Sequence, residues 1–239
     1  MKTKIISPIL LALLLIGMLT LAFNTQQVMA SLTVHNIDTG EDFATIQEAI
    51  DDPNTSDGHT IRVDSGIYYE HLTMNKSISL FGEDKHTTII DANGTGTVVS
   101  VTANNTSISG FTIRNGAMIT DQSGIRTLHS SGNYIFDNII TNNGHGILLA
   151  RSSDNTVSGN IICDNWGDGI WLYYSLRNNI SDNNIINNFV GIFLAASSNN
   201  NLFENLIANN DGYRSGGIAL GAESSSNSIY RNSLANNKH

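Results

Sequence analysis

The chain has 239 residues, 40% of them hydrophobic and 14% charged, with 21 glycines and only 2 prolines, which argues against a disordered linker and allows one large domain or a solenoid. Its formal net charge is −9 at pH 7, so its surface repels nucleic-acid phosphates and no nucleic-acid partner is expected. Cys163 is the single cysteine, which excludes an intrachain disulfide.

Residues 1–30 have the pattern of a secretory signal peptide. Lys2 and Lys4 precede an apolar run from Ile9 to Phe23, and small residues stand where a signal peptidase would cut, after Ala30. This run is shorter than the roughly 20 residues that span a bilayer, so we expect cleavage and no stable membrane span. The mature chain would then be secreted or held at the cell surface. An uncleaved membrane anchor is the alternative.

Residues 31–59 are expected to form an N-terminal cap region. The apolar residues between Asp42 and Asp51 lie three or four positions apart, which predicts a short amphipathic helix that covers the first coil of a solenoid. Short strands separated by Gly and Asn turns follow this helix. They are expected at Thr60–Val63, Ile78–Leu80, Thr88–Ile90, Val98–Val101 and Ile108–Ile113.

Residues 124–239 contain five copies of a pattern of about 22 residues, each introduced by a Gly-Ile pair. Three asparagine columns, five residues apart, run through all copies: Asn133, Asn155, Asn178, Asn200 and Asn227; Asn138, Asn160, Asn183, Asn205 and Asn232; and Asn143, Asn165, Asn188, Asn210 and Asn237. Apolar columns follow two residues after the first and second asparagines: Ile135, Val157, Ile180, Leu202 and Ile229, and Ile140, Ile162, Ile185, Ile207 and Leu234.

Short strands that recur at this interval, without reversing, stack on their equivalents one coil later and form parallel sheets with a spacing of about 4.8 Å. Asparagine suits the corners, because it tolerates the left-handed backbone conformation and identical side chains can hydrogen-bond from coil to coil. The repeat therefore predicts an all-β chain, with residues 31–239 wound into a single-stranded parallel β-helix behind the capping helix.

Four segments carry a family resemblance: FATIQEAID, IRVDSGIYYEHLTMNKSISLFGED, TIIDANGTG and ISGFTIRNG, followed by the Asn-x-Ile repeats. Together they resemble the pectin-lyase-like superfamily, and most of all its archaeal NosD-type surface members. The resemblance covers nearly all of residues 34–239 and implies a right-handed β-helix. It does not imply one activity, because that superfamily contains lyases, hydrolases, esterases, epimerases, adhesins and copper-site accessory proteins.

A first candidate site follows from the register of the repeats. His145 and Asp168 both precede the repeat glycine of consecutive copies, so they are expected one coil apart, where an imidazole beside a carboxylate could move a proton. An exposed strip that could stack on a sugar ring is expected beside them. Its candidate ligand-binding residues are Arg126, Leu148, Trp171, Tyr173 and Phe193. A partner or oligomer interface, or an ordinary surface, is the alternative.

Asp182 and Glu204 are a second candidate catalytic pair, because equivalent positions in consecutive coils lie about 5 Å apart, the carboxylate separation that retaining glycosidases use. A solvated charged face is the alternative. The histidines show no ligand spacing and no calcium nonapeptide occurs, so neither a metal site nor a cofactor is expected, although loose Ca²⁺ binding is allowed. Six asparagines stand in N-glycosylation sequons: Asn54, Asn75, Asn93, Asn104, Asn105 and Asn179.

The sequence favours a secreted or cell-surface protein that binds a polysaccharide or a glycoprotein glycan without a complete set of catalytic motifs. Gly144-His145-Gly146 matches one motif of the polygalacturonate hydrolases, but no adjacent Asp pair precedes it within the coils. The alternative is a lyase, hydrolase or epimerase that acts on uronate polymers. A structural role, or a part in copper-site maturation of the NosD type, is a further alternative.

Overall fold

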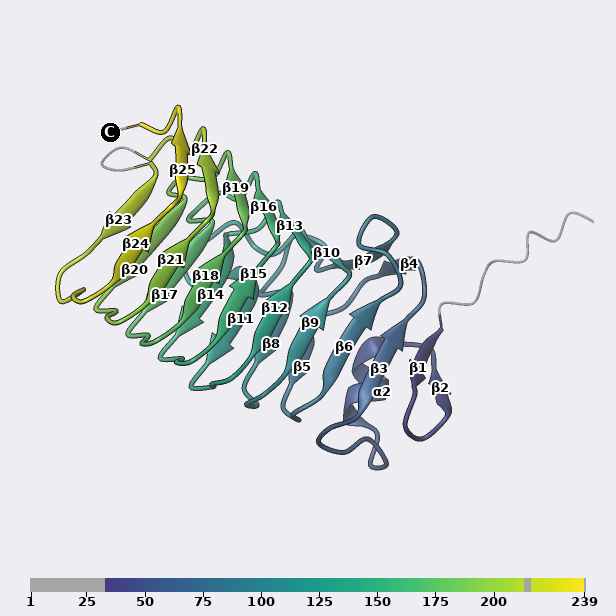
Figure 1. Cartoon of the computed structure of the whole chain (residues 1–239). Coiled ribbons are helices and arrows are strands. Elements are labelled where there is room, and N and C mark those ends of the chain that lie inside the picture. The colour runs from purple at the N-terminus through teal and green to yellow at the C-terminus, as the bar shows by residue number, and fades with distance from the viewer. Residues whose placement is uncertain (1–32, 213–215, 239) are drawn as a thin grey trace, which may run out of the picture. The chain divides into compact units, whose positions relative to one another are not determined.

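The computed structural model describes residues 33–212 and 216–238; the expected signal peptide, residues 1–30, lies outside the described residues. Leu32–His239 forms one compact unit, and its described part is a right-handed parallel β-solenoid with three sheets that run along its length (Figure 1). The predicted fold class is therefore confirmed. No helix within the described ranges is both long and apolar enough to cross a bilayer.

The three sheets take one short strand each from successive coils. In spatial order, sheet A contains β2 (Glu41–Phe43), β1 (Val34–Asn36), β3 (Thr60–Val63), β6 (Ser79–Gly82), β9 (Ser107–Ser109), β12 (Tyr134–Phe136), β15 (Thr156–Ser158), β18 (Asn179–Ser181), β21 (Asn201–Phe203) and β24 (Ser228–Tyr230). Sheet B contains β4 (Gly66–Tyr68), β7 (Thr88–Asp91), β10 (Thr112–Arg114), β13 (Ile139–Thr141), β16 (Ile161–Cys163), β19 (Asn184–Ile186), β22 (Leu206–Ala208) and β25 (Ser233–Ala235). Sheet C contains β5 (Leu72–Met74), β8 (Val99–Val101), β11 (Ser123–Leu128), β14 (His145–Ala150), β17 (Ile170–Tyr173), β20 (Ile192–Ala195) and β23 (Ile218–Leu220).

The N-terminal region differs from the prediction at its start. The capping helix α2 runs only from Ile46 to Asp51, and the Thr45 side chain caps it by accepting a hydrogen bond from the Glu48 N–H. The expected helix began at Asp42, but Asp42 and Phe43 belong to the strand Glu41–Phe43, which pairs antiparallel with β1. Backbone pairing at this sheet edge outweighs the helical spacing of the apolar residues.

The other early strands follow the prediction in part. Strand β3 has the predicted bounds, whereas the expected strand Ile108–Ile113 is divided into β9 and β10. The chain turns between them at Gly110, whose φ is +80°. A Cβ at Gly110 would lie 2.4 Å from the carbonyl oxygen of Gly82 in the preceding coil, so only glycine fits there. Strands β1, β2, β4 and β5 were not predicted.

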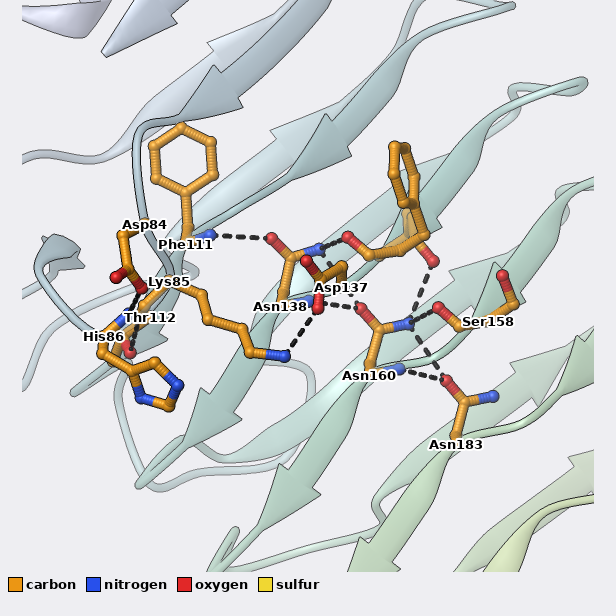
Figure 2. Close-up of polar contacts among 12 residues, drawn as sticks. Asp84, Lys85, His86, Phe111, Thr112, Asp137, Asn138, Ser158, Asn160 and Asn183 are labelled. Carbon is orange, nitrogen blue, oxygen red and sulfur yellow. Dashed lines mark hydrogen bonds and ion pairs between the residues drawn. The ribbon is translucent and has the colours of Figure 1, made fainter. Parts of the chain in front are cut away.

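The asparagine columns form continuous hydrogen-bond ladders inside the coil corners, as Figure 2 shows for Asn138, Asn160 and Asn183. The backbone N–H and the side-chain amide of Asn160 both donate to Asn183 Oδ1, at 3.0 Å each. The same side-chain amide donates to the carbonyl of Ile135 at 2.9 Å. Each asparagine thus satisfies buried backbone groups where the chain turns and no strand partner is available, and the predicted ladder is confirmed.

The left-handed backbone conformation was expected at these asparagines, but it lies one residue earlier in the second column. The residues that precede its asparagines have positive φ: Asp137 (51°), Gly159 (65°), Asp182 (57°), Glu204 (58°) and Arg231 (56°). Apart from Gly159, these left-handed residues have exposed side chains that project from the corner, and the asparagines that follow turn inward. The corner between sheets A and B therefore presents a column of charged side chains to solvent.

The apolar columns fill the interior as predicted. Ile135, Ile162 and Ile185 are at most 1% exposed, and the whole stack forms one hydrophobic core. In the last described coil the same columns are exposed, at Ile229 and Leu234.

Candidate functional site

His145 and Asp168 lie one coil apart at the edge of sheet C, as the repeat register predicts. His145 is the first residue of β14, and Asp168 stands two residues before β17, the next strand of the sheet. The backbone N–H of Asp168 donates to Nδ1 of His145 at 2.9 Å, and Asp168 Oδ2 lies 3.6 Å from the same nitrogen. The histidine ring is thus fixed to the backbone of the following coil.

Burial controls the charges of this pair, because the two side chains are only 8% and 10% exposed. Burial lowers the pKa of His145 to about 4, and the nearby Asp121 carboxylate opposes this effect. Burial also raises the pKa of Asp168 to about 7. The imidazole is therefore neutral at pH 7 and the carboxyl is partly protonated, so the 3.6 Å approach is not an ion pair of two full charges.

The hydrogen bond to Nδ1 determines the tautomer of the neutral ring. Because Nδ1 of His145 accepts from an amide N–H, the ring proton lies on Nε2. This Nε2–H is buried and has no hydrogen-bond partner among the described residues, and the same holds for Nε1–H of Trp171. The two rings are in contact, with centroids 4.9 Å apart. The site therefore contains two buried N–H groups side by side, without a hydrogen-bond partner among the described residues.

Ser123 pairs directly with His145 in sheet C, so Ser123, His145 and Asp168 occupy consecutive coils. The buried Ser123 hydroxyl also lacks a partner among the described residues. In a Ser-His-Asp nucleophile system, Nδ1–H donates to the carboxylate and Nε2 accepts the serine proton. Here Nδ1 is an acceptor and Nε2 holds the proton, so this arrangement does not activate Ser123.

A row of contacting rings continues from this cluster along the outer face of sheet C. We call His145, Trp171, Phe193, Tyr173 and Tyr174 the aromatic row. The Trp171 centroid lies 6.3 Å from that of Phe193 and 5.5 Å from that of Tyr173, and Tyr173 contacts Tyr174 at 4.6 Å. The exposed end is tyrosine, since Tyr173 is 37% and Tyr174 50% exposed.

Sequence reasoning missed Tyr174, because it follows the last residue of β17. Its positive φ of 49° turns it outward at the end of the strand. The Arg151 guanidinium lies over its ring, 6.0 Å from the centroid. The one signal in the sequence was the repeat register, which aligns Tyr174 with Arg151 and Ala196. These two residues also have a positive φ, directly after β14 and β20.

The prediction that Leu148 is exposed was wrong. Leu148 is 5% exposed, because it pairs with Arg126 on one side and Trp171 on the other, and these larger side chains cover it. Arg126, Trp171 and Phe193 are themselves half-buried. The expected exposed strip is therefore a largely buried aromatic row with an exposed tyrosine end.

Asp182 and Glu204 lie elsewhere, at the corner where sheet A leads into sheet B. Both are exposed, and Glu204 forms an ion pair with Arg231 in the next coil, with Oε1 and the guanidinium nitrogen 3.3 Å apart. Asp137 in the same column pairs with Lys85 (Figure 2). The structure does not bring these acids to His145 and Asp168, and their catalytic role stays a prediction.

The described residues contain no group of three or more His, Cys, Asp or Glu side chains that could hold a metal ion. The imidazole of His35 uses both nitrogens, on Asp42 at 2.6 Å and on Asp64 at 3.0 Å. Burial raises the pKa of the half-buried Cys163 thiol. Because Cu²⁺ and Cu⁺ select imidazole, thiolate or thioether clusters, the donors present in the described part of the chain do not fit a copper centre.

Comparisons with known proteins agree with this fold. The chain is 34% identical over 129 residues to a cell surface glycoprotein of Methanothermus fervidus; the match covers 54% of this chain and about a fifth (21%) of that protein. A solved structure from Geobacillus virus E2 superposes with a TM-score of 0.58 at 15% identity, over 92% of this chain and 52% of that one.

Two enzymes have the same fold. A double mutant of a periplasmic alginate epimerase superposes with a TM-score of 0.53 at 19% identity, over 72% of this chain and 47% of that one. A pectin methylesterase from Erwinia chrysanthemi superposes with a TM-score of 0.52 at 17% identity, over 76% and 63%. The model of the family described as periplasmic copper-binding protein (NosD) matches residues 53–239. The chain belongs to the NosD family.

Proposed function

We propose that this chain is an extracytoplasmic surface protein that binds an acidic polysaccharide along the outer face of sheet C and does not catalyse a reaction on it. The observation that supports this proposal is the aromatic row, whose rings contact one another from His145 to the exposed Tyr174. Aromatic faces bind the C–H surfaces of sugar rings, and adjacent polar groups fix the orientation of the sugar.

The polar groups around the row are donors. His145 Nε2–H and Trp171 Nε1–H lack partners among the described residues, and Arg126 stands two coils before Trp171 in the same column. The two ring N–H groups are buried, so the donor that a ligand on the outer face can reach is the half-buried Arg126 guanidinium, which favours a ligand group that accepts two hydrogen bonds. The carboxylate of a uronate sugar has this property.

The extracytoplasmic placement is supported by the names of the relatives. The family is described as periplasmic, and the archaeal relative is called a cell surface glycoprotein. The pattern of residues 1–30, which predicts a secretory signal, agrees with both.

The protonation of His145 supports binding over catalysis. A general base needs a free lone pair directed at the substrate, and Nε2 of the neutral ring carries a proton instead. One observation favours the second candidate, a lyase, hydrolase or epimerase: the pKa of Asp168 near 7 is suited to a general acid. Incubation of the protein with uronate polymers separates the two, because new reducing ends, unsaturated products or epimers would form only with an enzyme.

A glycan array tests the binding proposal. Trp171→Ala and Tyr174→Ala should each weaken binding about two- to tenfold, since loss of one aromatic stacking contact costs about 0.5–1.5 kcal/mol and 1.4 kcal/mol is a factor of ten. Tyr134→Ala is the matched control, because Tyr134 is an exposed tyrosine, 40% accessible, on sheet A.

Light scattering on the same proteins tests the remaining interpretation. If the row is an oligomer interface, Trp171→Ala changes the molar mass and there is no glycan binding to lose. Glycan binding that is equal in Trp171→Ala, Tyr174→Ala and the parent protein contradicts the proposal.

A further inference from the structure

The six N-glycosylation sequons differ in how far the folded chain leaves the asparagine side-chain amide free of contacts with other residues. From this difference we propose that Asn75 and Asn93 are the sites at which the folded protein accepts N-linked glycans. The proposal concerns a covalent modification, and it stands independently of glycan binding at sheet C.

Two sequons are closed by hydrogen bonds. The Asn54 side-chain amide donates to Glu41 at 3.0 Å, although the hydroxyl residue of its sequon, Ser56, is exposed. Asn179 is half-buried within β18, and its Oδ1 accepts from the Asn201 amide at 2.9 Å. In both sequons another side chain thus holds the asparagine side-chain amide that a transferase must reach.

The overlapping sequons at Asn104 and Asn105 are also held. Asn104 Oδ1 accepts from the backbone N–H of Ser131 at 2.8 Å, and the Thr106 hydroxyl of its sequon is buried and donates to Asn133. The side chain of Asn105 packs on the next coil, since a Cβ at Gly132 would lie 2.3 Å from its Oδ1. Although both side chains are exposed, each amide group thus contacts the following coil through its oxygen.

The side-chain amides of Asn75 and Asn93 have no such contacts. Both are exposed, and neither side-chain amide hydrogen-bonds to a residue of the described ranges. Asn75 lies in the turn between β5 and β6, and Asn93 in the turn between β7 and β8. Thr95, the hydroxyl residue of the Asn93 sequon, is exposed, and its hydroxyl hydrogen-bonds to the Ala92 carbonyl at 2.9 Å and to His71 at 3.0 Å.

The reaction is a transfer from a lipid-linked oligosaccharide. The amide nitrogen Nδ2 of Asn75 or Asn93 forms a bond to the anomeric carbon of the first sugar. The bond between that carbon and the phosphate oxygen of the lipid carrier breaks, so the lipid phosphate leaves with the electron pair. A base of the transferase takes the amide proton. No oxidant or reductant is involved.

These positions keep the modification away from the aromatic row. Asn93 precedes β8, and the row begins on β14, two strands further along sheet C. At about 4.8 Å per coil, this separation is about 10 Å along the stack, and Trp171 lies one coil further. The attachment points therefore lie in the first coils, before the part of sheet C that carries the aromatic row.

The test uses the purified folded chain, a single-subunit oligosaccharyltransferase and a lipid-linked oligosaccharide of defined mass, with peptide mapping by mass spectrometry. In the folded protein, Asn75 and Asn93 should be modified and the other four sequons should not. After denaturation in urea and dilution into the assay, Asn54 and Asn179 should also be modified. Asn75→Gln and Asn93→Gln should each lose the mass of one glycan, and Asn142→Gln, an exposed asparagine outside a sequon, should lose none.

Three results overturn the proposal: an unmodified Asn75 or Asn93 in the folded protein, comparable modification of any other sequon in the folded protein, or no modification in either state. Because the assay reads covalent mass, none of these results bears on whether sheet C binds a polysaccharide.

Discussion

Replacement of one ladder asparagine tests how the coils are joined. Asn183 is 1% exposed, and its Oδ1 accepts from both the backbone and the side-chain N–H of Asn160. Its own amide donates to the carbonyl of Val157 at 2.9 Å and to Asn205 Oδ1 at 3.0 Å. Asn183→Ala removes all four hydrogen bonds and leaves the buried N–H of Asn160 unsatisfied.

The cost follows from these contacts. An unsatisfied buried backbone donor costs about 1–3 kcal/mol. Each of the other lost hydrogen bonds costs about 1 kcal/mol, or less if the group that is left finds a new partner. We therefore expect the free energy of unfolding to decrease by about 3 kcal/mol. Ser181→Ala is the matched control on the same coil, because Ser181 is 7% exposed and its side chain makes no hydrogen bond to the described residues. Urea unfolding followed by circular dichroism measures both. Equal stabilities of Asn183→Ala and Ser181→Ala would refute the ladder as the source of corner stability.

Two further predictions concern the core and the buried pair. Ile185→Asp places a charge in a fully buried column and should abolish folding, whereas Ile186→Asp, half-buried on the outer side of the same strand, should still give a cooperative thermal transition by circular dichroism; a folded Ile185→Asp would show that the strand register is wrong. For pH, His145 resists protonation in the folded state, so it lowers stability as pH falls from 6.5 to about 4, while Asp168 has the opposite effect between 3.8 and about 7. Asp168→Asn leaves only the histidine effect. As pH falls from 6.5 to about 4, the unfolding free energy of this variant should therefore decrease by about 3 kcal/mol more than that of the parent, at 1.36 kcal/mol per pKa unit, in urea titrations at each pH. Parallel pH profiles of the two proteins would contradict the burial of the pair.

Most of the coil architecture could be predicted, because the asparagine and isoleucine columns recur in one register, and a parallel stack is the one arrangement that places every column inside. The hairpin of β1 and β2 could not, since three-residue strands such as Glu41–Phe43 carry too little alternation to outweigh the helical spacing that continues to Ile50. A repeating pattern predicts only the pairing of equivalent strands, and the irregular N-terminal segment has no such repeat.

The candidate site could also be predicted only in part: its position in the coils followed from the repeat, but its exposure and protonation did not. The register placed His145 beside Asp168, but the exposure of a side chain depends on the size of its neighbours in adjacent coils, and Arg126 and Trp171 cover Leu148. The proton position on His145 depends on one hydrogen bond from the backbone of Asp168, which the spacing of residues does not contain. Tyr174 required knowledge of where β17 ends.

The most direct test of the central claim uses the fluorescence of Trp171. The chain has two tryptophans, and Trp166 is 57% exposed, so Trp166→Phe leaves Trp171 as the single reporter inside the aromatic row. Titration of this protein with uronate oligosaccharides should change the Trp171 emission in a saturable manner, and the change should be weakened in the Tyr174→Ala background but not in the Tyr134→Ala background. An emission spectrum that does not change with any uronate oligosaccharide would contradict binding at sheet C.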